Sequence, residues 1–290
     1  MSVPARSVPL FADIADVSRR LAQTGYLPDT ATATAVFLAD RLKPLLVEGP
    51  AGVGKTELAR AVAQATGSGL VRLQCYEGVD EARALYEWNH AKQILRIQSG
   101  SGDWEATKDD VFSEEFLLQR PLLTAIRRTE PTVLLIDETD KADIEIEGLL
   151  LEVLSDFAVT VPELGTLTAT RAPFVLLTSN ATRELSEALK RRCLFLHIDF
   201  PTPEMERRIL LSRVPELPEH IAEELVRIIG VLRGMQLKKL PSIAETIDWG
   251  RTVLALGLDT IDDAVVAATL GVVLKHQSDQ QRATGELRLN

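Results

Sequence analysis

The sequence predicts an α/β domain built on a five-stranded parallel sheet, followed by a small all-helical domain. Five short apolar segments alternate with helical patterns in the first two thirds of the chain, at residues 45–47, 70–75, 133–136, 174–177 and 194–198. Strands that alternate with helices are typical of parallel sheets. Only helical patterns follow the Pro-Thr-Pro sequence at 201–203. We therefore expect domains at residues 1–202 and 203–290.

Two helices are expected before the first strand, because apolar residues recur at helical spacing around residues 10–21 and over 30–41. Eight further helices are expected after the first strand, at residues 57–65, 116–128, 144–154, 182–191, 204–213, 218–232, 243–256 and 261–274. The last four lie in the second domain and have no strand pattern between them. We expect the residues from about Ser278 onward to be frayed.

Two segments do not fit a minimal alternation of strand and helix. Residues 76–112 are polar, carry two tryptophans and contain the Ser-Gly-Ser-Gly turn at 99–102, so we interpret them as an insertion. Residues 157–171 alternate in polarity around Pro-Glu-Leu-Gly, which predicts a hairpin.

Composition excludes several classes of protein. The chain has 290 residues with 46% hydrophobic and 26% charged residues, as in ordinary globular proteins. Its net charge of −10 argues against a general nucleic-acid-binding surface. Cys75 and Cys193 are expected to be reduced thiols, and no histidine has metal-ligand spacing, so no zinc site is expected. Without a signal sequence or a long apolar run, we expect a cytoplasmic protein with no membrane span.

The strand at 45–47 runs into a loop with the pattern G-x-x-x-x-G-K-T. Its residues are Gly49, Pro50, Ala51, Gly52, Val53, Gly54, Lys55 and Thr56. Glycines let the backbone wrap around phosphates, and the following helix directs unpaired N–H groups at them. We expect a bound nucleoside triphosphate, with Lys55 at the β- and γ-phosphates and the Thr56 hydroxyl on Mg²⁺. Glu57, the next residue, is placed in the same nucleotide-binding set.

An acidic pair ends the apolar strand at 133–136. Asp137 and Glu138 follow this strand, and ligands of open α/β sheets bind at the carboxyl ends of strands. We expect Asp137 to hold Mg²⁺, directly or through water, and Glu138 to polarise the attacking water. The sequence therefore predicts ATP hydrolysis as well as ATP binding.

Polar residues after the later strands complete the predicted site. Asn180 follows the strand at 174–177 and can orient the water or touch the γ-phosphate. Arg191 and Arg192 end the next predicted helix, and one of them can project toward a neighbouring subunit's nucleotide as an arginine finger. The alternative for these arginines is a solvated charge pair favoured by the helix dipole.

Two further contacts with the nucleotide are expected. Arg251, in the helical domain, can fold back onto the phosphates; the alternative is a surface salt bridge with Asp248. Tyr26 and Leu27, with the preceding Gly25, lie ahead of the first strand, where we expect the adenine pocket.

Taken together, these residues resemble the AAA+ ATPases, in the order phosphate loop, acidic strand end, strand-end Asn, helix-end Arg and helical lid carrying Arg. The stretches Glu48–Thr56 and Asp137–Ala142, with the insertion, resemble the MoxR family. In that family the insertion corresponds to a helix-2 insert, and the hairpin to a pre-sensor hairpin. More narrowly, Gln74–Gly78 and Lys239–Trp249 look like the CoxD-type branch.

This resemblance implies a cytoplasmic, ring-forming ATPase, expected to be a hexamer, that uses ATP and Mg²⁺ and acts as a chaperone. It also implies a partner with a von Willebrand A domain and a metalloenzyme client, such as the molybdenum–copper carbon monoxide dehydrogenase associated with CoxD-like proteins. Two features depart from the family pattern. Arg191-Arg192-Cys193 replaces a single Arg before Phe, and alignment by position favours Arg192. Arg251 follows Trp249-Gly250 rather than Ser-Pro.

Other functions remain open from the sequence. A nucleic-acid motor or loader would need basic insertions, yet residues 76–112 carry eight acidic residues against four basic ones. A nucleotide switch with little turnover is disfavoured by the intact acidic pair. A small-molecule kinase would not explain Asn180 and the helical lid with Arg251.

Overall fold

The computed structural model describes residues 9–99 and 111–287. The chain forms two compact units. One contains residues through Thr24, then Pro28–Glu48 and Thr56–His197; the other contains Gly25–Leu27, Gly49–Lys55 and the residues from Ile198 onward. Most of the turn expected at 99–102 lies outside the described residues. No helix in the described ranges is long and apolar enough to cross a membrane.

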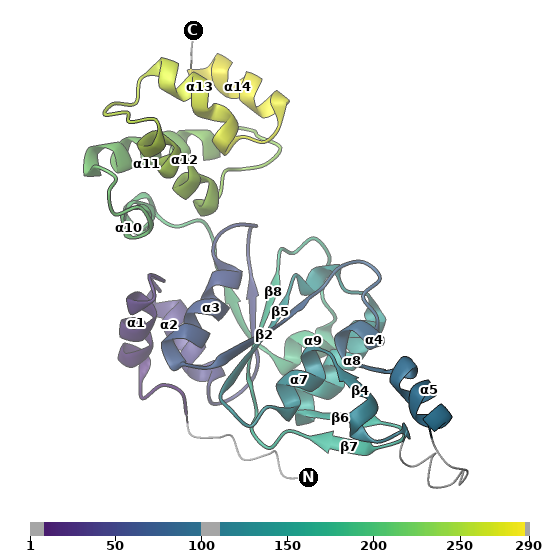
Figure 1. The fold of residues 1–290 in the computed structure, drawn as a ribbon. Coiled ribbons are helices and arrows are strands. Elements are labelled where there is room, and N and C mark those ends of the chain that lie inside the picture. Colours follow the sequence, from purple (N-terminus) through teal and green to yellow (C-terminus); the bar gives the residue numbers. More distant parts are fainter. Residues whose placement is uncertain (1–8, 100–110, 288–290) are drawn as a thin grey trace. The chain divides into compact units, whose positions relative to one another are not determined.

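A five-stranded, fully parallel sheet forms the centre of the first unit, which confirms the predicted fold class (Figure 1). Its spatial order is β2-β5-β8-β1-β9. The strands are β1 (Leu45–Glu48), β2 (Gly69–Gln74), β5 (Thr132–Asp137), β8 (Phe174–Ser179) and β9 (Leu194–His197). Strands β5 and β8 are buried along their whole length, which accounts for their continuous apolar sequences. Because all five run in one direction, their carboxyl ends meet at one edge.

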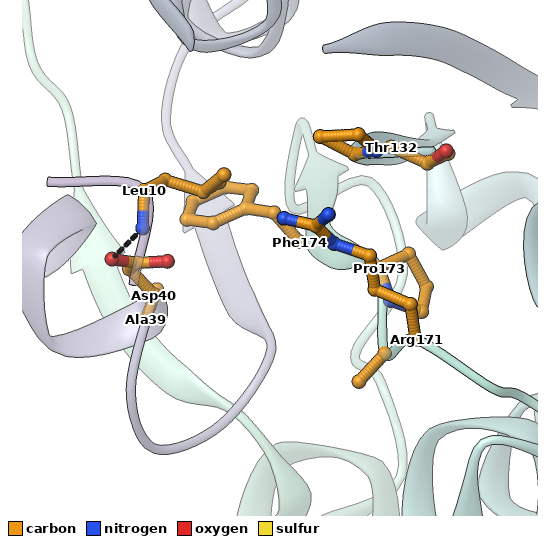
Figure 2. Close-up of a pocket in the computed structure, with 9 residues that line it drawn as sticks. Leu10, Ala39, Asp40, Thr132, Arg171, Pro173 and Phe174 are labelled. Carbon is orange, nitrogen blue, oxygen red and sulfur yellow. Dashed lines mark hydrogen bonds between the residues drawn. The ribbon is translucent and has the colours of Figure 1, made fainter. Parts of the chain in front are cut away.

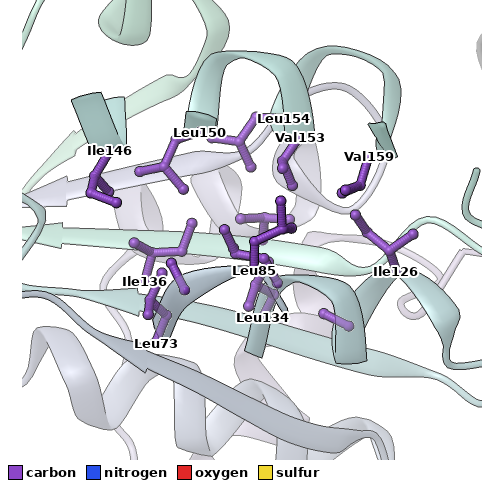
Figure 3. Close-up of a cluster of buried hydrophobic side chains, with 14 of the residues drawn as sticks. Leu73, Leu85, Ile126, Leu134, Ile136, Ile146, Leu150, Val153, Leu154 and Val159 are labelled. Atoms are coloured by element: carbon purple, nitrogen blue, oxygen red, sulfur yellow. The ribbon is translucent and has the colours of Figure 1, made fainter. Parts of the chain in front are cut away.

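Helices cover both faces of this sheet (Figure 1). On one side lie α1 (Ile14–Gln23), α2 (Thr30–Ala39) and α3 (Lys55–Thr66), and on the other α7 (Pro121–Arg127), α8 (Ile144–Asp156) and α9 (Glu187–Arg192). Figure 3 shows how α8 packs on the second face. Ile146, Leu150 and Val153 lie over Leu134 and Ile136, and all five side chains are at most 2% exposed. This burial supplies the main stabilising term for the unit.

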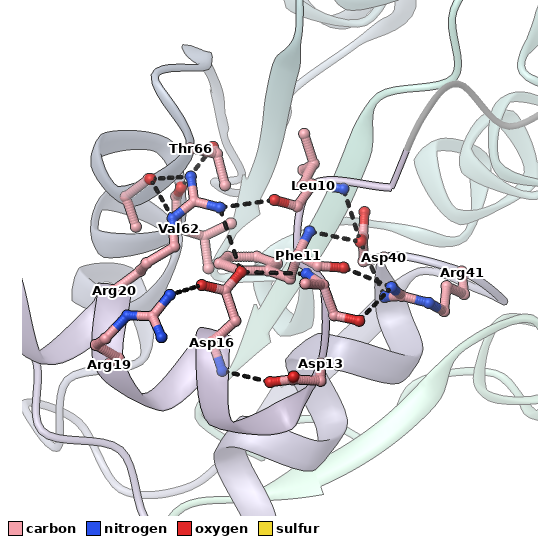
Figure 4. A network of polar contacts seen from close by, with 12 residues as sticks. Leu10, Phe11, Asp13, Asp16, Arg19, Arg20, Asp40, Arg41, Val62 and Thr66 are labelled. Carbon is pink, nitrogen blue, oxygen red and sulfur yellow. Dashed lines mark hydrogen bonds and ion pairs between the residues drawn. The ribbon is translucent and has the colours of Figure 1, made fainter.

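A polar network holds the segment ahead of α1 (Figure 4). Asp40 Oδ2 accepts the backbone N–H groups of Leu10 at 2.9 Å and Phe11 at 3.2 Å. The guanidinium of Arg20 donates to the carbonyl of Leu10 at 2.8 Å and, through Nε, to that of Ala65 at 3.1 Å. These bonds pair backbone groups of residues 10 and 11 and fix the segment against α2 and α3.

The insertion contains its own short elements. These are α4 (Glu81–Ala84), β3 (Tyr86–Trp88), α5 (His90–Ser99), a 3₁₀ turn η1 (Glu114–Phe116) and β4 (Leu117–Gln119). The helix expected over 116–128 is therefore wrong in its first part. Leu117–Gln119 pair antiparallel with Tyr86–Trp88, and the helix begins only at Pro121, whose fixed φ suits the first helical position.

The segment expected as a hairpin forms an antiparallel pair, β6 (Ala158–Val161) with β7 (Gly165–Thr168). The helix expected over 182–191 is shorter, since α9 begins only after Ser186. That serine accepts the backbone N–H of Leu189 through its hydroxyl and thereby caps the helix.

The second unit contains a helical bundle. Its helices are α10 (Pro203–Arg213), α11 (Glu219–Arg233), α12 (Ile243–Ala255), α13 (Asp263–Val273) and α14 (Gln277–Leu287). Trp249 is fully buried in its core, and its indole N–H donates to Thr269 Oγ1 at 2.8 Å. The expected fraying from Ser278 is wrong. Helix α14 buries Ala283, and Asp279 accepts the backbone N–H groups of Lys238 and Lys239.

Candidate functional site

The phosphate loop joins β1 to α3 and depends on glycine at three positions. Gly49, Gly52 and Gly54 have φ angles of 155°, 79° and 102°, a range that other residues seldom adopt. A Cβ on Gly49 would also overlap the carbonyl of Ile198. The backbone can therefore turn closely enough to present N–H groups to an anion. Helix α3 begins at Lys55, as a phosphate loop requires.

Lys55 is buried and folds back over its own loop. Its Nζ donates to the carbonyl oxygens of Gly49 at 2.6 Å and Pro50 at 2.7 Å. These bonds satisfy a cation that burial would otherwise destabilise. They also fix the ammonium at the loop, where it adds positive charge to that of the helix terminus.

One residue expected near the base lies close to this loop. Tyr26 lies beside Gly54: a Cβ built on that glycine would be 3.8 Å from Cε2 of the tyrosine ring. Leu27, next in the chain, is half-buried. Glu57 lies in the first turn of α3, 3.9 Å from the guanidinium of Arg60.

The carboxylate of Asp137, at the end of β5, lies at the centre of a hydrogen-bonded cluster. Its Oδ1 accepts from the hydroxyls of Thr56 at 2.9 Å and Thr178 at 2.6 Å. Its Oδ2 accepts from Arg72 through Nε at 3.1 Å and Nη2 at 2.5 Å. The side chain is 3% exposed, so these four bonds hold it in one orientation.

Thr56 and Asp137 fit a magnesium ion. They place a hydroxyl and a carboxylate oxygen 2.9 Å apart, and Thr56 directly follows the phosphate-loop Lys55 in the sequence. Magnesium prefers oxygen ligands and is usually held by one or two carboxylates together with substrate phosphates. In the described residues no group of three or more His, Cys, Asp and Glu side chains is arranged to hold a metal without such help.

Glu138 begins the turn after β5 in an unusual backbone conformation. Its φ of 57° and ψ of 48° are left-handed, which is uncommon for a residue with a side chain and is found at functional positions. The backbone N–H donates to Thr178 Oγ1 at 2.8 Å. Its Oε2 accepts from Gln74 Nε2 at 2.9 Å and from Lys141 Nζ at 2.6 Å. The carboxylate is thus held in a partly exposed position beside Asp137.

Asn180 follows the end of β8, which pairs with β5. The next peptide turns sharply, with Ala181 at φ 56° and its N–H donated to Ser179 Oγ at 3.0 Å. The register aligns Ile136 with Leu177, so the residues after β5 and β8 share one edge of the sheet. The predicted Asn180 therefore lies at the same edge as Asp137.

The two candidate finger arginines end α9 and are both exposed. Arg192 donates from Nε to Ser155 Oγ at 2.5 Å. Within the described ranges, the Arg191 side chain forms no hydrogen bond or ion pair, and the Arg191 carbonyl accepts from Lys43 Nζ. Arg191 is therefore the freer of the two side chains.

Arg251, on α12, is 61% exposed and lies 3.5 Å from the carboxylate of Asp248. This is the surface salt bridge that the sequence left open as the alternative. Such exposed pairs contribute little to stability.

Comparison with known proteins identifies the family of this chain. Residues 44–193, just over half of the chain, match the AAA domain family, dynein-related subfamily. The chain belongs to this family. It is 24% identical over 242 residues to the chaperone protein ClpB of Chlamydia pneumoniae and 27% over 244 residues to that of Chlamydia caviae. Each match covers 78% of this chain, which spans about a quarter (26%) of either ClpB.

Among solved structures, a point mutant of RuvB from Thermotoga maritima has a similar fold. Its TM-score is 0.50 at 17% sequence identity, and the match covers 98% of this chain and 74% of that one. At this identity the likeness concerns the fold alone. It agrees with the α/β sheet and the helices described above.

Three side chains that contact the acidic pair were not among the predicted site residues. Arg72 and Gln74 reach Asp137 and Glu138 from β2, and Thr178 reaches both from β8. Gln74 aligns with Asp137 across the β2–β5 pair. The order of strands, which the sequence does not give, was the signal needed to find them.

Both cysteines lie outside this chemistry. Burial raises the pKa of Cys75 to about 12, with the carboxylates of Asp137, Asp140 and Glu138 adding to the shift. Burial also raises the pKa of Cys193 to about 12. Both thiols therefore stay protonated at neutral pH and are poor nucleophiles.

A small pocket lies at the other end of the strands (Figure 2). It is lined in part by Thr132 and Phe174, the first residues of β5 and β8, with Arg171 and Asp40 nearby. Asp137 and Ser179 end the same two strands. The pocket is therefore separate from the candidate site.

A second buried carboxylate, Glu147 on α8, holds the loop that leads to α9. Its Oε1 accepts from Arg183 at 2.5 Å and its Oε2 from the backbone N–H of Ser186 at 3.0 Å. Burial raises the pKa of Glu147, but the bonds from Ser186 and Arg183 outweigh it and hold the pKa below its ordinary value. The ionised form therefore stabilises the folded chain.

We expect Glu147→Gln to lower the free energy of unfolding by about 2 kcal/mol at neutral pH, because a charged hydrogen-bond acceptor is lost. The lowered pKa means that this stabilisation is complete above the ordinary pKa of 4.5 and disappears as pH falls through the folded value. Urea unfolding of both proteins at neutral pH and at decreasing acid pH measures it. A difference that stayed constant below pH 4.5 would contradict the assignment.

Proposed function

We propose that this AAA domain chain is an ATP-dependent chaperone of the MoxR type, which hydrolyses ATP to remodel or mature a partner protein. The observation that carries the proposal is the cluster in which Asp137 joins Thr56 and Thr178, with Glu138 held beside it. A protein that only binds ATP has no need of a second carboxylate placed at this edge of the sheet.

In the proposed mechanism, Lys55 binds the β- and γ-phosphates. Thr56 and Asp137 would hold a magnesium ion, which would supply positive charge at the phosphate oxygens. Glu138 accepts a proton from the attacking water or orients it. Both hydrogen bonds from Gln74 and Lys141 end on Oε2 of Glu138, so Oε1 is the oxygen we assign to the water. Asn180 positions the same water or the γ-phosphate.

We further propose that subunits assemble into a ring, expected to be a hexamer, in which Arg191 or Arg192 completes the neighbour's site. Both arginines are exposed at the end of α9, where a neighbour can reach them. A cation supplied in this way neutralises charge in the transition state and accelerates phosphoryl transfer strongly. Turnover should therefore require assembly.

Mixing two inactive variants tests this shared site. Lys55→Ala subunits keep the arginines but cannot bind ATP, whereas Arg191→Ala or Arg192→Ala subunits bind ATP but lack one arginine. Each alone should turn over at less than about a hundredth of the wild-type rate if the changed arginine is the finger. Mixtures should regain activity, and the arginine variant that is rescued identifies the finger. Two arginine variants that both retain full activity would exclude a finger at these positions.

The chaperone assignment rests on the similarity to ClpB and on two elements outside the minimal core, the insertion and the β6–β7 hairpin. The resemblance of Gln74–Gly78 and Lys239–Trp249 to CoxD-like proteins favours a metalloenzyme client and a partner with a von Willebrand A domain. A Glu138→Gln trap should retain a client with ATP and release it with ADP. Identical capture with either nucleotide would contradict a nucleotide-driven cycle.

A further inference from the structure

A buried carboxylate joins the segment after Glu138 to the loop that carries Asn180. Asp140 lies in the 3₁₀ turn η2 (Thr139–Lys141) and is 3% exposed. Its Oδ2 accepts two bonds from Thr182, the backbone N–H at 3.0 Å and the hydroxyl at 2.5 Å. Asp140 is two residues after Glu138, and Thr182 is two residues after Asn180. The contact between Asp140 and Thr182 thus joins the segment that carries Glu138 to the segment that carries Asn180.

The Asp140 carboxylate is buried in an environment that, in the described part of the chain, satisfies only one of its two oxygens. Its Oδ1 is buried and, among the described residues, has no hydrogen-bond partner of ordinary geometry. A buried acceptor left in this state is destabilised relative to one in water. Burial raises the pKa of Asp140, but the two bonds from Thr182 outweigh it and hold the pKa below its usual range. The carboxylate is therefore ionised and directed at the Asn180 loop.

The backbone on both sides of the contact is set in an unusual conformation. Glu138 and Ala181 are left-handed, with φ angles of 57° and 56°. Such residues persist only where surrounding contacts hold them. Thr178 fixes one side through the N–H of Glu138, and Asp140 fixes the other through Thr182.

We propose that Asp140 and Thr182 are positioning residues, which set the distance between the Asn180 amide and the Glu138 carboxylate for hydrolysis. This inference rests on the proposed ATPase function. Neither residue belongs to the phosphate loop or to the predicted magnesium pair, so the contact should affect the chemical step and leave nucleotide affinity unchanged. Small displacements of positioned groups lower rates by about 10- to 100-fold.

Thr182→Val removes the hydroxyl at nearly constant size, and Thr182→Ser keeps it. In the assembled protein we expect Thr182→Val to lower kcat about tenfold, with the Kd for Mg-ATP changed by less than about twofold, and Thr182→Ser to restore kcat. Thr34→Val, which removes a hydroxyl bonded to a carbonyl within α2, is the matched control and should match the wild type. Equal kcat in Thr182→Val and the wild type, or a loss that the serine variant does not restore, would overturn the proposal.

Hydrogen exchange separates this proposal from the ATPase assignment. The backbone N–H of Thr182 should be protected in the wild type and exchange faster in Asp140→Ala, whether or not the protein turns over ATP. Protection lost without a change in kcat would refute the positioning role and leave the ATPase function intact. Absence of turnover in the wild type, with protection as expected, would refute the proposed function itself.

Discussion

Lys55→Ala should abolish nucleotide binding, with the affinity for Mg-ATP reduced at least about 100-fold. The change removes a cation that makes charge-assisted hydrogen bonds with the phosphates, each contributing about 1.5–3 kcal/mol. The ammonium is already held at the loop by the carbonyls of Gly49 and Pro50, so the wild type needs little rearrangement to bind. Calorimetry or a fluorescent nucleotide measures the affinity.

A matched control is Lys275→Ala, which removes an exposed lysine bonded to carbonyls of α13. It should bind Mg-ATP as the wild type does. The fold of Lys55→Ala is checked by its circular dichroism spectrum. A folded Lys55→Ala protein with wild-type affinity would show that this loop does not hold the triphosphate.

Glu138→Gln should separate binding from hydrolysis. The glutamine keeps the size and hydrogen-bonding capacity of the side chain but cannot accept a proton from water, so kcat should fall by about 10²–10⁴-fold. Affinity for Mg-ATP should change by less than about twofold, because Lys55, Thr56 and Asp137 are unaltered. Phosphate release under saturating ATP measures the first quantity, and equilibrium binding the second.

The control for this change is Glu152→Gln, on an exposed position of α8. It neutralises one carboxylate without touching the cluster at Asp137 and should keep the wild-type kcat. Full activity in Glu138→Gln would show that Glu138 is not the catalytic carboxylate.

How much of the site the sequence predicted depends on how its residues are distributed along the chain. The phosphate loop is one continuous stretch of sequence, and so is the acidic strand end. The chemistry of each therefore follows from residue order alone. Arg72 and Thr178 belong to strands on either side of β5, and their role appears only when the strand order is known. Asp140 and Thr182 are 42 residues apart and meet for the same reason.

The fold was predicted well where burial decides the pattern. Strands β5 and β8 are completely buried and read as apolar runs. Prediction was wrong where long-range pairing competes with helical spacing: Leu117–Gln119 have apolar residues that suit a helix, but they pair with β3. At the end of the chain, polar α14 is held by Asp279 and the buried Ala283, contacts that periodicity does not show.

The most direct test of the account is ADP formation per subunit from Mg-ATP, measured as the protein concentration is raised through the range of assembly. We predict that turnover per subunit rises with concentration and reaches a plateau when the oligomer is complete, since each site needs an arginine from its neighbour. Bound ATP that stays unhydrolysed at every concentration, despite the intact Asp137 and Glu138, would contradict the account.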